Sequence, residues 1–286
     1  MCLKQNIREP MTNNEIIAAA YDAGVKEEYN RLVSNPLFEA EFELISELMK
    51  QYIPEGSTVI DIGAGPGRYA EFLLKRNCKV GLVDLSARSL KAFKERIPVY
   101  LHKGVLFSKV SCATNLSFIE DTSADAVFLM GPLYHLINCD ERTKAISEAF
   151  RILKKGGYLF AVFLSTFERM HHHHDEKSPC CTDAIKKLLR DSVTAVEFQG
   201  YQVPQYKCLP QVAINSFEPC GLETIHIRNL EGIGNHYSAK GLQEYSTPDS
   251  KKNLFDKLRS ESEVRDTIGL ADQFLYVGKK HTIFDK

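Results

Sequence analysis

The stretch that decides the fold of this chain is Val59-Ile60-Asp61-Ile62-Gly63-Ala64-Gly65-Pro66-Gly67-Arg68-Tyr69. An apolar strand contains an acidic residue near its end, three glycines follow at alternate positions, and a helix then begins. Glycine lets the backbone turn sharply and approach a ligand closely. The free N–H groups at a helix start favour an anion. The stretch therefore predicts a nucleotide-like cofactor at the carboxyl ends of a parallel sheet.

The spacing of the glycines distinguishes between cofactors. A dinucleotide site has the pattern G-x-G-x-x-G, in which the last glycine lets the helix pack closely on the strand. Here Arg68 occupies the position of that last glycine. A nicotinamide-dependent oxidoreductase is therefore disfavoured, and it stays open as an alternative.

A second acidic residue follows at the spacing expected for a ribose. Lys79–Asp84 is predicted to be the next strand, and Asp84 ends it about 20 residues beyond the first glycines. A carboxylate there accepts hydrogen bonds from ribose hydroxyls, as it also does in NAD enzymes. Ser86 is expected to cap a helix over residues 87–96.

Several motifs in order resemble class I S-adenosylmethionine (SAM) dependent methyltransferases. The glycine loop resembles their first motif, and Val83-Asp84-Leu85-Ser86 resembles their second. Gly67-Arg68-Tyr69 and Gly131-Pro132-Leu133-Tyr134-His135-Leu136 are similar to a small bacterial subgroup. A helix over 140–153, a glycine stop and an apolar strand over 158–164 complete the resemblance, which covers residues 58–164.

This resemblance implies S-adenosyl-L-methionine as the cofactor. In the family, an acid before an alanine holds the adenine amino group, and Cys112 occupies that position before Ala113. A thiol is a weak hydrogen-bonding group, so we expect adenine to be recognised by backbone groups of Ala113 and by apolar walls. The expected cofactor-binding residues are Tyr21, Asp61, Gly63, Ala64, Gly65, Arg68, Asp84, Leu85, Ser86, Cys112, Ala113, Thr114, Met130 and Gly131.

The activated methyl group of SAM requires mainly alignment of an acceptor lone pair. A base is needed only for an acceptor that must lose a proton. His135 is the first candidate for it, because an unperturbed imidazole titrates near pH 6.5, and Tyr134 is expected to orient the acceptor. A structural or pocket-lining role for His135 stays open. His226 and two residues of a later insertion, His236 and Tyr237, are secondary candidates.

The fold class implied by the resemblance is α/β, with a Rossmann-like seven-stranded class I methyltransferase sheet and helices on both faces. Residues 1–54 are expected to form N-terminal helices, over 14–31 and 38–52, that close over the cofactor. Residues 55–164 form the SAM-binding core. Residues 165–286 add the last strands, with an antiparallel closing strand over 273–279, and two insertions that form a lid.

Composition narrows the class of partner. The net charge is −1 over 286 residues, without the basic balance of a nucleic-acid binder. No apolar run reaches the ~18 residues of a membrane span, and the N-terminus lacks an apolar signal region, so a cytoplasmic location is expected. We expect a small-molecule acceptor, no nucleic acid and no membrane. A non-catalytic SAM-binding protein is a further alternative.

The eight cysteines include no C-x-x-C pair, which argues against a zinc knuckle and against a disulfide framework in a reducing compartment. The run His171–His174 lies near Cys180 and Cys181. Consecutive imidazoles cannot converge in a regular helix or strand, so no metal ligand is assigned. Binding of a soft or borderline metal by these imidazoles and thiols stays open as an alternative.

Overall fold

The computed structural model describes residues 10–166, 192–232 and 242–281. Its centre is a sheet that contains the seven strands expected of a class I methyltransferase, in the order β3-β2-β1-β4-β5-β9-β8. Strands β1 to β5 are parallel, and β9 runs antiparallel to both β5 and β8, as predicted. The strands are β1 Thr58–Ile62, β2 Lys79–Asp84, β3 Val105–Val110, β4 Ala124–Leu129, β5 Leu153–Ser165, β8 Leu222–Asn229 and β9 Gln273–Lys280.

A hairpin adds two strands to this sheet. Strands β6 (Val193–Phe198) and β7 (Tyr201–Cys208) pair antiparallel, and β7 pairs with the last two residues of β5. The β4 pairing of β5 ends at Ala161, whereas β9 pairs with it as far as Leu164. The hairpin therefore occupies the side that β4 has left, beyond the carboxyl end of β4. The register of β6 and β7 is regular along the whole hairpin.

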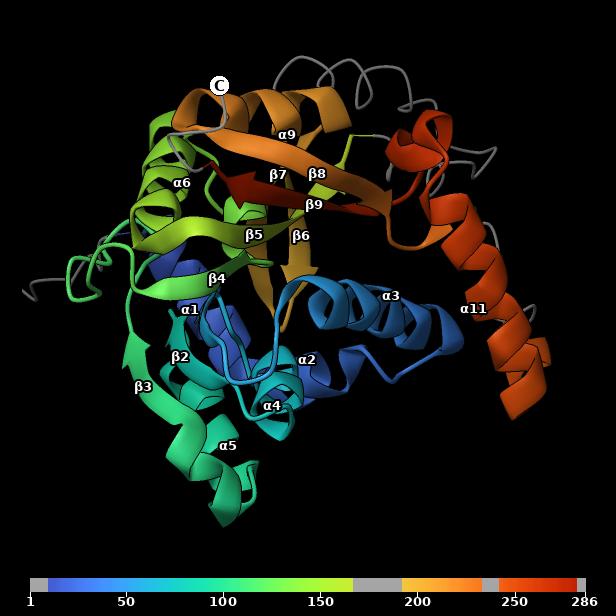
Figure 1. Cartoon of the computed structure of the whole chain (residues 1–286), viewed down its shortest axis with the longest axis horizontal. Helices are drawn as coiled ribbons and strands as arrows, with labels where there is room; N and C mark the ends of the chain where they lie inside the picture. The colour runs from blue at the N-terminus through green and yellow to red at the C-terminus, as the bar shows by residue number, and fades with distance from the viewer. Residues whose placement is uncertain (1–9, 167–191, 233–241, 282–286) are drawn as a thin grey trace, which may run out of the picture.

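Helices cover both faces of the sheet (Figure 1). Alternate strand residues face opposite sides, since the side-chain period of a strand is two. Ile60 and Val127 pack with α6 and α9 on one face, whereas Val59 and Phe128 pack with α3, α4 and α5 on the other. The helices are α1 Asn13–Ala23, α2 Val25–Arg31, α3 Pro36–Tyr52, α4 Arg68–Lys75, α5 Ala87–Arg96, α6 Cys139–Ile152, α9 Pro210–Phe217 and α11 Pro248–Ser262. Short 3-10 turns are η1 Val99–Gly104, η2 Pro132–Tyr134, η3 Glu218–Cys220, η5 Gln243–Tyr245 and η6 Arg265–Leu270.

The single helix predicted over 14–31 is wrong in one respect, because the chain breaks into α1 and α2 at Gly24. The Phe198 ring from the hairpin comes within 2.4 Å of the position that a Gly24 Cβ would occupy. The hairpin therefore packs directly against the junction of the two helices. Ile17 and Ala20 of α1 share a small apolar cluster with Val203 of β7.

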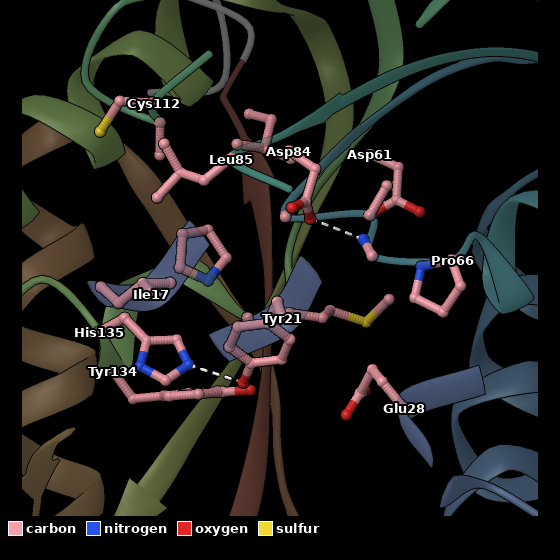
Figure 2. Close-up of a pocket in the computed structure, with 18 of the residues that line it drawn as sticks. Ile17, Tyr21, Glu28, Asp61, Pro66, Asp84, Leu85, Cys112, Tyr134 and His135 are labelled. Carbon is pink, nitrogen blue, oxygen red and sulfur yellow. Dashed lines mark hydrogen bonds between the residues drawn. The ribbon is translucent and has the colours of Figure 1, made fainter. Parts of the chain in front are cut away.

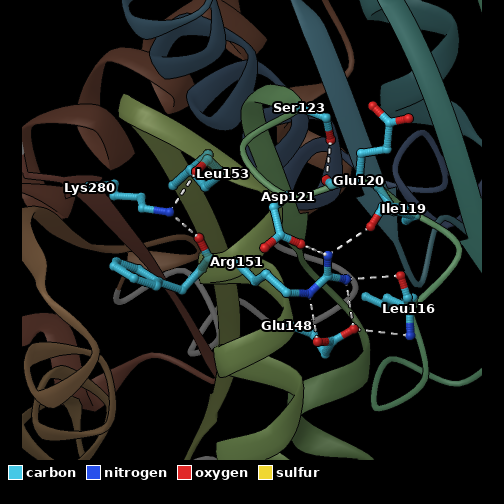
Figure 3. A network of polar contacts seen from close by, with 10 residues as sticks. Leu116, Ile119, Glu120, Asp121, Ser123, Glu148, Arg151, Leu153 and Lys280 are labelled. Carbon is cyan, nitrogen blue, oxygen red and sulfur yellow. Dashed lines mark hydrogen bonds and ion pairs between the residues drawn. The ribbon is translucent and has the colours of Figure 1, made fainter.

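The loop between β3 and β4 is held by one arginine of α6 (Figure 3). Arg151 donates hydrogen bonds to the carbonyl oxygens of Leu116 and Ile119, and it forms ion pairs with Asp121 and Glu148. A loop of this length gains little order from its own backbone. The guanidinium thus fixes the segment that follows residues 111–113.

Lys280 of β9 contacts the carboxyl end of α6. Its Nζ donates to the carbonyl oxygens of Phe150 and Leu153 at 2.6 and 2.7 Å. These contacts satisfy carbonyl groups at a helix end, and the cation complements the helix dipole. Among the described residues, no helix is long and apolar enough to cross a membrane.

Candidate active site

A pocket lies at the carboxyl edge of the sheet, between the strand ends and α1 (Figure 2). Most of the residues predicted to bind a cofactor line it, and α1 and α2 supply further walls. The lining residues are Asn14, Ile17, Tyr21, Glu28, Arg31, Leu32, Asp61, Ile62, Gly63, Ala64, Gly65, Pro66, Arg68, Tyr69, Asp84, Leu85, Ser111, Cys112, Ala113, Met130, Gly131, Pro132, Tyr134, His135 and Leu136.

The glycine loop is tied to β2 by backbone hydrogen bonds. The N–H groups of Gly63 and Ala64 donate to the Val83 carbonyl oxygen, and the Gly65 N–H donates to Asp84 Oδ2 at 2.7 Å. At Gly65 an added Cβ would have no heavy atom nearer than 3.9 Å, so its open side faces the pocket. At Gly67, φ is +75° and an added Cβ would lie 2.3 Å from the Phe93 ring. Gly65 therefore leaves a surface open to a ligand, whereas Gly67 lets α4 pack closely against Phe93 of α5.

Two carboxyl groups lie beneath the loop, with Asp61 buried and Asp84 partly buried. Asp84 accepts hydrogen bonds from the N–H groups of Gly65 and Ser86, and burial still raises its pKa to about 6. Burial raises the pKa of Asp61 to about 7, and the charge of Asp84 adds to the shift. Desolvation favours the neutral carboxyl. A positively charged ligand would therefore favour the ionised form of both carboxyl groups near neutral pH.

The pocket has an apolar end near Cys112 (Figure 2). Leu85 and Ile17 lie there, and the Thr114 hydroxyl donates to Cys112 Sγ at 3.3 Å. Thr114 and Ser86 are the two predicted binding residues outside the lining. The fully buried Ser86 side chain caps α5 and donates to Asp22 of α1 at 2.6 Å.

The opposite end of the pocket is charged. Arg31 pairs with Glu28 at 3.2 Å and with the buried Glu41 of α3 at 3.2 Å. The hydroxyl of Tyr69 is buried there, with no hydrogen-bond partner among the described residues. A buried polar atom without a partner costs stability. This end therefore offers a donor and charges of both signs to a ligand.

Tyr21 and His135 form a hydrogen-bonded pair on the pocket wall (Figure 2). Tyr21 Oη lies 2.9 Å from His135 Nε2, and His135 Nδ1 lies 3.1 Å from the Pro204 carbonyl oxygen of the hairpin. A carbonyl oxygen only accepts, so Nδ1 carries the proton and Nε2 accepts from the Tyr21 hydroxyl. Burial lowers the pKa of His135 to about 4. The imidazole is therefore neutral at physiological pH.

Arg68 lines the pocket, but its guanidinium is engaged elsewhere. It donates to the Tyr29 carbonyl oxygen at 2.9 and 2.6 Å and lies over the Tyr29 ring at 4.1 Å from the centroid. The residue that breaks the dinucleotide pattern thus links α4 to α2. His226 lies outside the pocket lining and is hydrogen-bonded to Tyr52 at 2.5 Å.

The remaining sequence predictions fall outside the described ranges. They are the histidine run with Cys180 and Cys181, and the secondary candidates His236 and Tyr237. Within the residues that the structure describes, no group of three or more His, Cys, Asp or Glu could hold a metal ion.

Five side chains of α1, α2 and α4 line the pocket but were not predicted to do so: Asn14, Ile17, Glu28, Arg31 and Tyr69. Asn14, Ile17 and Tyr21 are spaced i, i+3 and i+7, which places them on one helix face. That spacing from the predicted Tyr21 is the signal that could have revealed the first two.

The comparisons with known proteins agree with this geometry. Residues 60–161 match the family model of a methyltransferase domain. This part of the chain is therefore similar to methyltransferase domains, and its strands have the order of the class I methyltransferase fold. The cofactor of this domain is S-adenosyl-L-methionine.

Two curated relatives and one solved structure are similar to this chain. A SAM-dependent Diels–Alderase from Talaromyces variabilis is 27% identical over 137 residues, 48% of this chain and 45% of that protein. A tRNA (carboxymethyluridine(34)-5-O)-methyltransferase from Arabidopsis thaliana is 31% identical over 107 residues, 37% of this chain and 24% of that protein. The chain thus spans less than half the length of these relatives. A crystal structure of a SAM-dependent methyltransferase from Listeria monocytogenes shares the fold, with 16% identity, a TM-score of 0.58, and coverage of 85% of this chain and 99% of that one.

The residues present fit SAM. The open side of Gly65 leaves room for a ligand backbone, and the Asp84 carboxylate lies at the strand end where a ribose is held. The Tyr69 hydroxyl, which has no hydrogen-bond partner among the described residues, and the Arg31 guanidinium suit the polar methionine end. The apolar side chains of Ile17 and Leu85 suit a base.

Proposed function

We propose that this protein transfers a methyl group from SAM to a small-molecule acceptor. One observation carries the proposal: a single pocket joins the Gly65 loop and Asp84 to the Tyr21–His135 pair. The cofactor side and the wall that could position an acceptor thus belong to one cavity. In this proposal, helices α1 and α2 and the hairpin cover the cavity.

SAM supplies an activated methyl group on a sulfonium centre when bound. Asp84 would hold the ribose, and Arg31, Glu28 and Tyr69 would hold the methionine end. Met130 and Gly131 follow β4 and would flank the centre of the cofactor.

The contacts of His135 favour a positioning role over that of a general base. Its Nε2 lone pair accepts from Tyr21, and the low pKa leaves it a weak base. Because that bond uses the tyrosine proton, the remaining lone pairs of the Tyr21 oxygen can accept a hydrogen bond from the acceptor. The Tyr134 ring packs 4.6 Å from the His135 imidazole, centroid to centroid, and would support this arrangement.

A small molecule is favoured over RNA by charge. The whole chain carries a net charge of −1, whereas RNA binding rests on clustered basic residues. The charged end of the pocket contains both Glu28 and Arg31, and charges of both signs suit a polar acceptor. The Arabidopsis relative makes a transfer RNA anticodon fragment a necessary member of any acceptor panel.

The test begins with calorimetry of SAM, S-adenosylhomocysteine and NADH. We expect micromolar binding of the two adenosyl ligands and none of NADH. Tritium transfer from methyl-labelled SAM to a panel of phenols, amines, carboxylates, thiols and RNA then identifies the acceptor. SAM binding without transfer to any of them would contradict methyl transfer and would favour a non-methylating use of SAM, as the name of the Talaromyces relative describes. Binding of NADH alone would overturn the cofactor.

A further inference from the structure

We infer that Asn14 reads the 6-amino group of the adenine ring, at the end of the pocket where Cys112 lies. This inference rests on the SAM site of the proposed function. It assigns a specificity-determining role to a residue of the N-terminal helix.

Asn14 lies at the apolar end of the pocket. Its Nδ2 is 3.9 Å from Cys112 Sγ, although the two residues are 98 positions apart in the chain. It is the second residue of α1 and shares a helix face with Ile17 and Tyr21, which also line the pocket. The Asn14 side chain therefore lies next to the Cys112 thiol.

The other side chains at this end offer little to a base. The Ser111 hydroxyl donates to the Asn115 carbonyl oxygen at 2.8 Å, and the Thr114 hydroxyl donates to Cys112 Sγ. A thiol is a weak donor and a weak acceptor. Ile17 and Leu85 are apolar. In the described part of the chain, the Asn14 carboxamide is thus the strongest hydrogen-bonding side chain at this end.

A carboxamide matches adenine chemically. Its oxygen accepts from the 6-amino group while its NH₂ donates to a ring nitrogen, and asparagine pairs with adenine in this way in nucleic-acid recognition. Among the described residues, the only hydrogen bond of the Asn14 side chain is the long one to the Cys112 sulfur. A sulfur contact of this length is weak, so the carboxamide loses little when it turns toward a base.

The helix that carries Asn14 is anchored at three points. The Thr12 and Glu15 side chains form a capping box at its start. Asp22 near its end accepts hydrogen bonds from the Ser86 hydroxyl and the Arg88 N–H, at 2.6 and 3.0 Å. Tyr21 is held by His135. Asn14 is therefore presented on a fixed element, which specific recognition requires.

The test compares S-adenosylhomocysteine with its analogue that carries hydrogen in place of the 6-amino group. Calorimetry on the full chain gives the dissociation constant of each. For the unaltered protein we expect the analogue to bind about tenfold more weakly, the loss of one hydrogen bond. Asn14→Ala should weaken the binding of S-adenosylhomocysteine by about the same factor. The variant protein should then bind the two ligands with equal affinity.

Three variants separate recognition from folding. Asn14→Asp keeps an acceptor for the amino group and should retain the preference for S-adenosylhomocysteine. Asn13→Ala alters the exposed neighbouring asparagine of the same helix start and should change neither affinity. The double variant N14A/C112D places an acid at position 112. It should restore the preference for S-adenosylhomocysteine over the analogue.

Two results would overturn the inference. One is equal binding of the two ligands by the unaltered protein. The other is an undiminished preference in Asn14→Ala, which would assign the amino group to the backbone of residues 112–114. Both leave S-adenosylhomocysteine bound, whereas failure of the SAM site itself would abolish binding of both ligands in every variant.

Discussion

The Tyr21 hydroxyl and the His135 imidazole are joined by a 2.9 Å hydrogen bond that connects α1 to the segment after β4. The second ring nitrogen of His135 donates to the Pro204 carbonyl oxygen of the hairpin. One imidazole therefore joins three elements that lie far apart in the sequence. Because its tautomer is set by Pro204, it also sets the direction of the Tyr21 proton.

The first prediction concerns this pair. His135→Ala should lower turnover roughly 10- to 100-fold, the scale expected when a positioning contact is lost. The affinity for S-adenosylhomocysteine should stay within about twofold, because the contacts of the glycine loop and Asp84 are untouched. Steady-state kinetics and calorimetry measure the two effects. His226→Ala removes a similar tyrosine–histidine bond outside the pocket and is the matched control.

The pH profile distinguishes positioning from proton abstraction. The pKa of about 4 keeps His135 neutral throughout the range from pH 5.5 to 8. A general base with an ordinary imidazole pKa would lose activity as pH falls through about 6.5. We therefore expect no ionisation near 6.5 that disappears in His135→Gln. An ionisation near pH 6.5 that is lost in His135→Gln would instead show that His135 acts as the general base.

The second prediction is proton release on SAM binding. Asp61 and Asp84 have pKa values raised to about 7 and 6, so part of this pair holds a proton at pH 7. A nearby positive charge favours the ionised carboxylate and lowers both values. SAM carries a sulfonium charge that S-adenosylhomocysteine lacks. Its affinity should therefore rise between pH 6 and 8, more steeply than that of S-adenosylhomocysteine.

Calorimetry in buffers of different ionisation enthalpy counts the released protons. We expect a larger count for SAM than for S-adenosylhomocysteine at pH 7, and a smaller difference in Asp61→Asn. Equal counts for the two ligands would show that the two carboxyl groups do not sense the sulfonium.

The third prediction concerns Asp84. Its removal in Asp84→Ala should weaken SAM binding by ~1–3 kcal/mol, because a charged hydrogen-bond partner of the ribose is lost. The same change also removes the acceptor of the Gly65 and Ser86 N–H groups. Asp84→Asn keeps one acceptor oxygen and separates the two losses. Unchanged affinity in both variants would rule out the ribose contact.

Much of the fold could be predicted because it is encoded locally. The strand over Lys79–Asp84 and the helix over Ala87–Arg96 have the predicted bounds. Each has a clear apolar period and a polar end, and Ser86 caps the helix through its side chain. The break at Gly24 could not be predicted in this way, since it depends on a Phe198 ring more than 170 positions away.

The same distinction applies to the pocket. The loop from Gly63 to Gly65 and Asp84 could be predicted from spacing, because each follows a strand directly. Glu41 and Arg31 are different, since their ion pair joins two helices and its place in the pocket depends on tertiary packing. The hairpin was missed for a similar reason: it joins the sheet through only two residue pairs with β5.

The fourth prediction contrasts two glycines of one loop. Gly65 and Gly67 both have positive φ, at +51° and +75°, so alanine costs about 1 kcal/mol of backbone strain at either position. Gly65→Ala places its methyl in the open pocket and should weaken SAM binding at least tenfold. Gly67→Ala drives its methyl into Phe93 and should lower the free energy of unfolding by ~2–4 kcal/mol. Calorimetry measures the loss of binding and thermal melts measure the loss of stability, each on both variants.

The fifth prediction concerns Arg151, which acts on the pocket from outside it. Its guanidinium holds the loop after Cys112 through two carbonyl oxygens (Figure 3). Arg151→Ala removes this donor from both, and among the described residues the Leu116 oxygen keeps only the Ile119 N–H as a donor. We expect a loss of ~1–3 kcal/mol in the free energy of unfolding and a several-fold weaker affinity for S-adenosylhomocysteine. Arg151→Lys keeps the charge but loses the forked geometry that reaches both carbonyls, so it should recover only part of either loss.

The control for Arg151 is an exposed ion pair without backbone contacts. Lys252 and Asp256 lie one turn apart on α11, and Lys252→Ala should change stability by less than about 0.5 kcal/mol. Hydrogen exchange localises the effect. Faster exchange at residues 111–119 in Arg151→Ala, with β1 and β2 unchanged, is the expected pattern. Exchange that accelerates uniformly would instead mean that Arg151 supports the whole sheet, and its link to the adenine end would be lost.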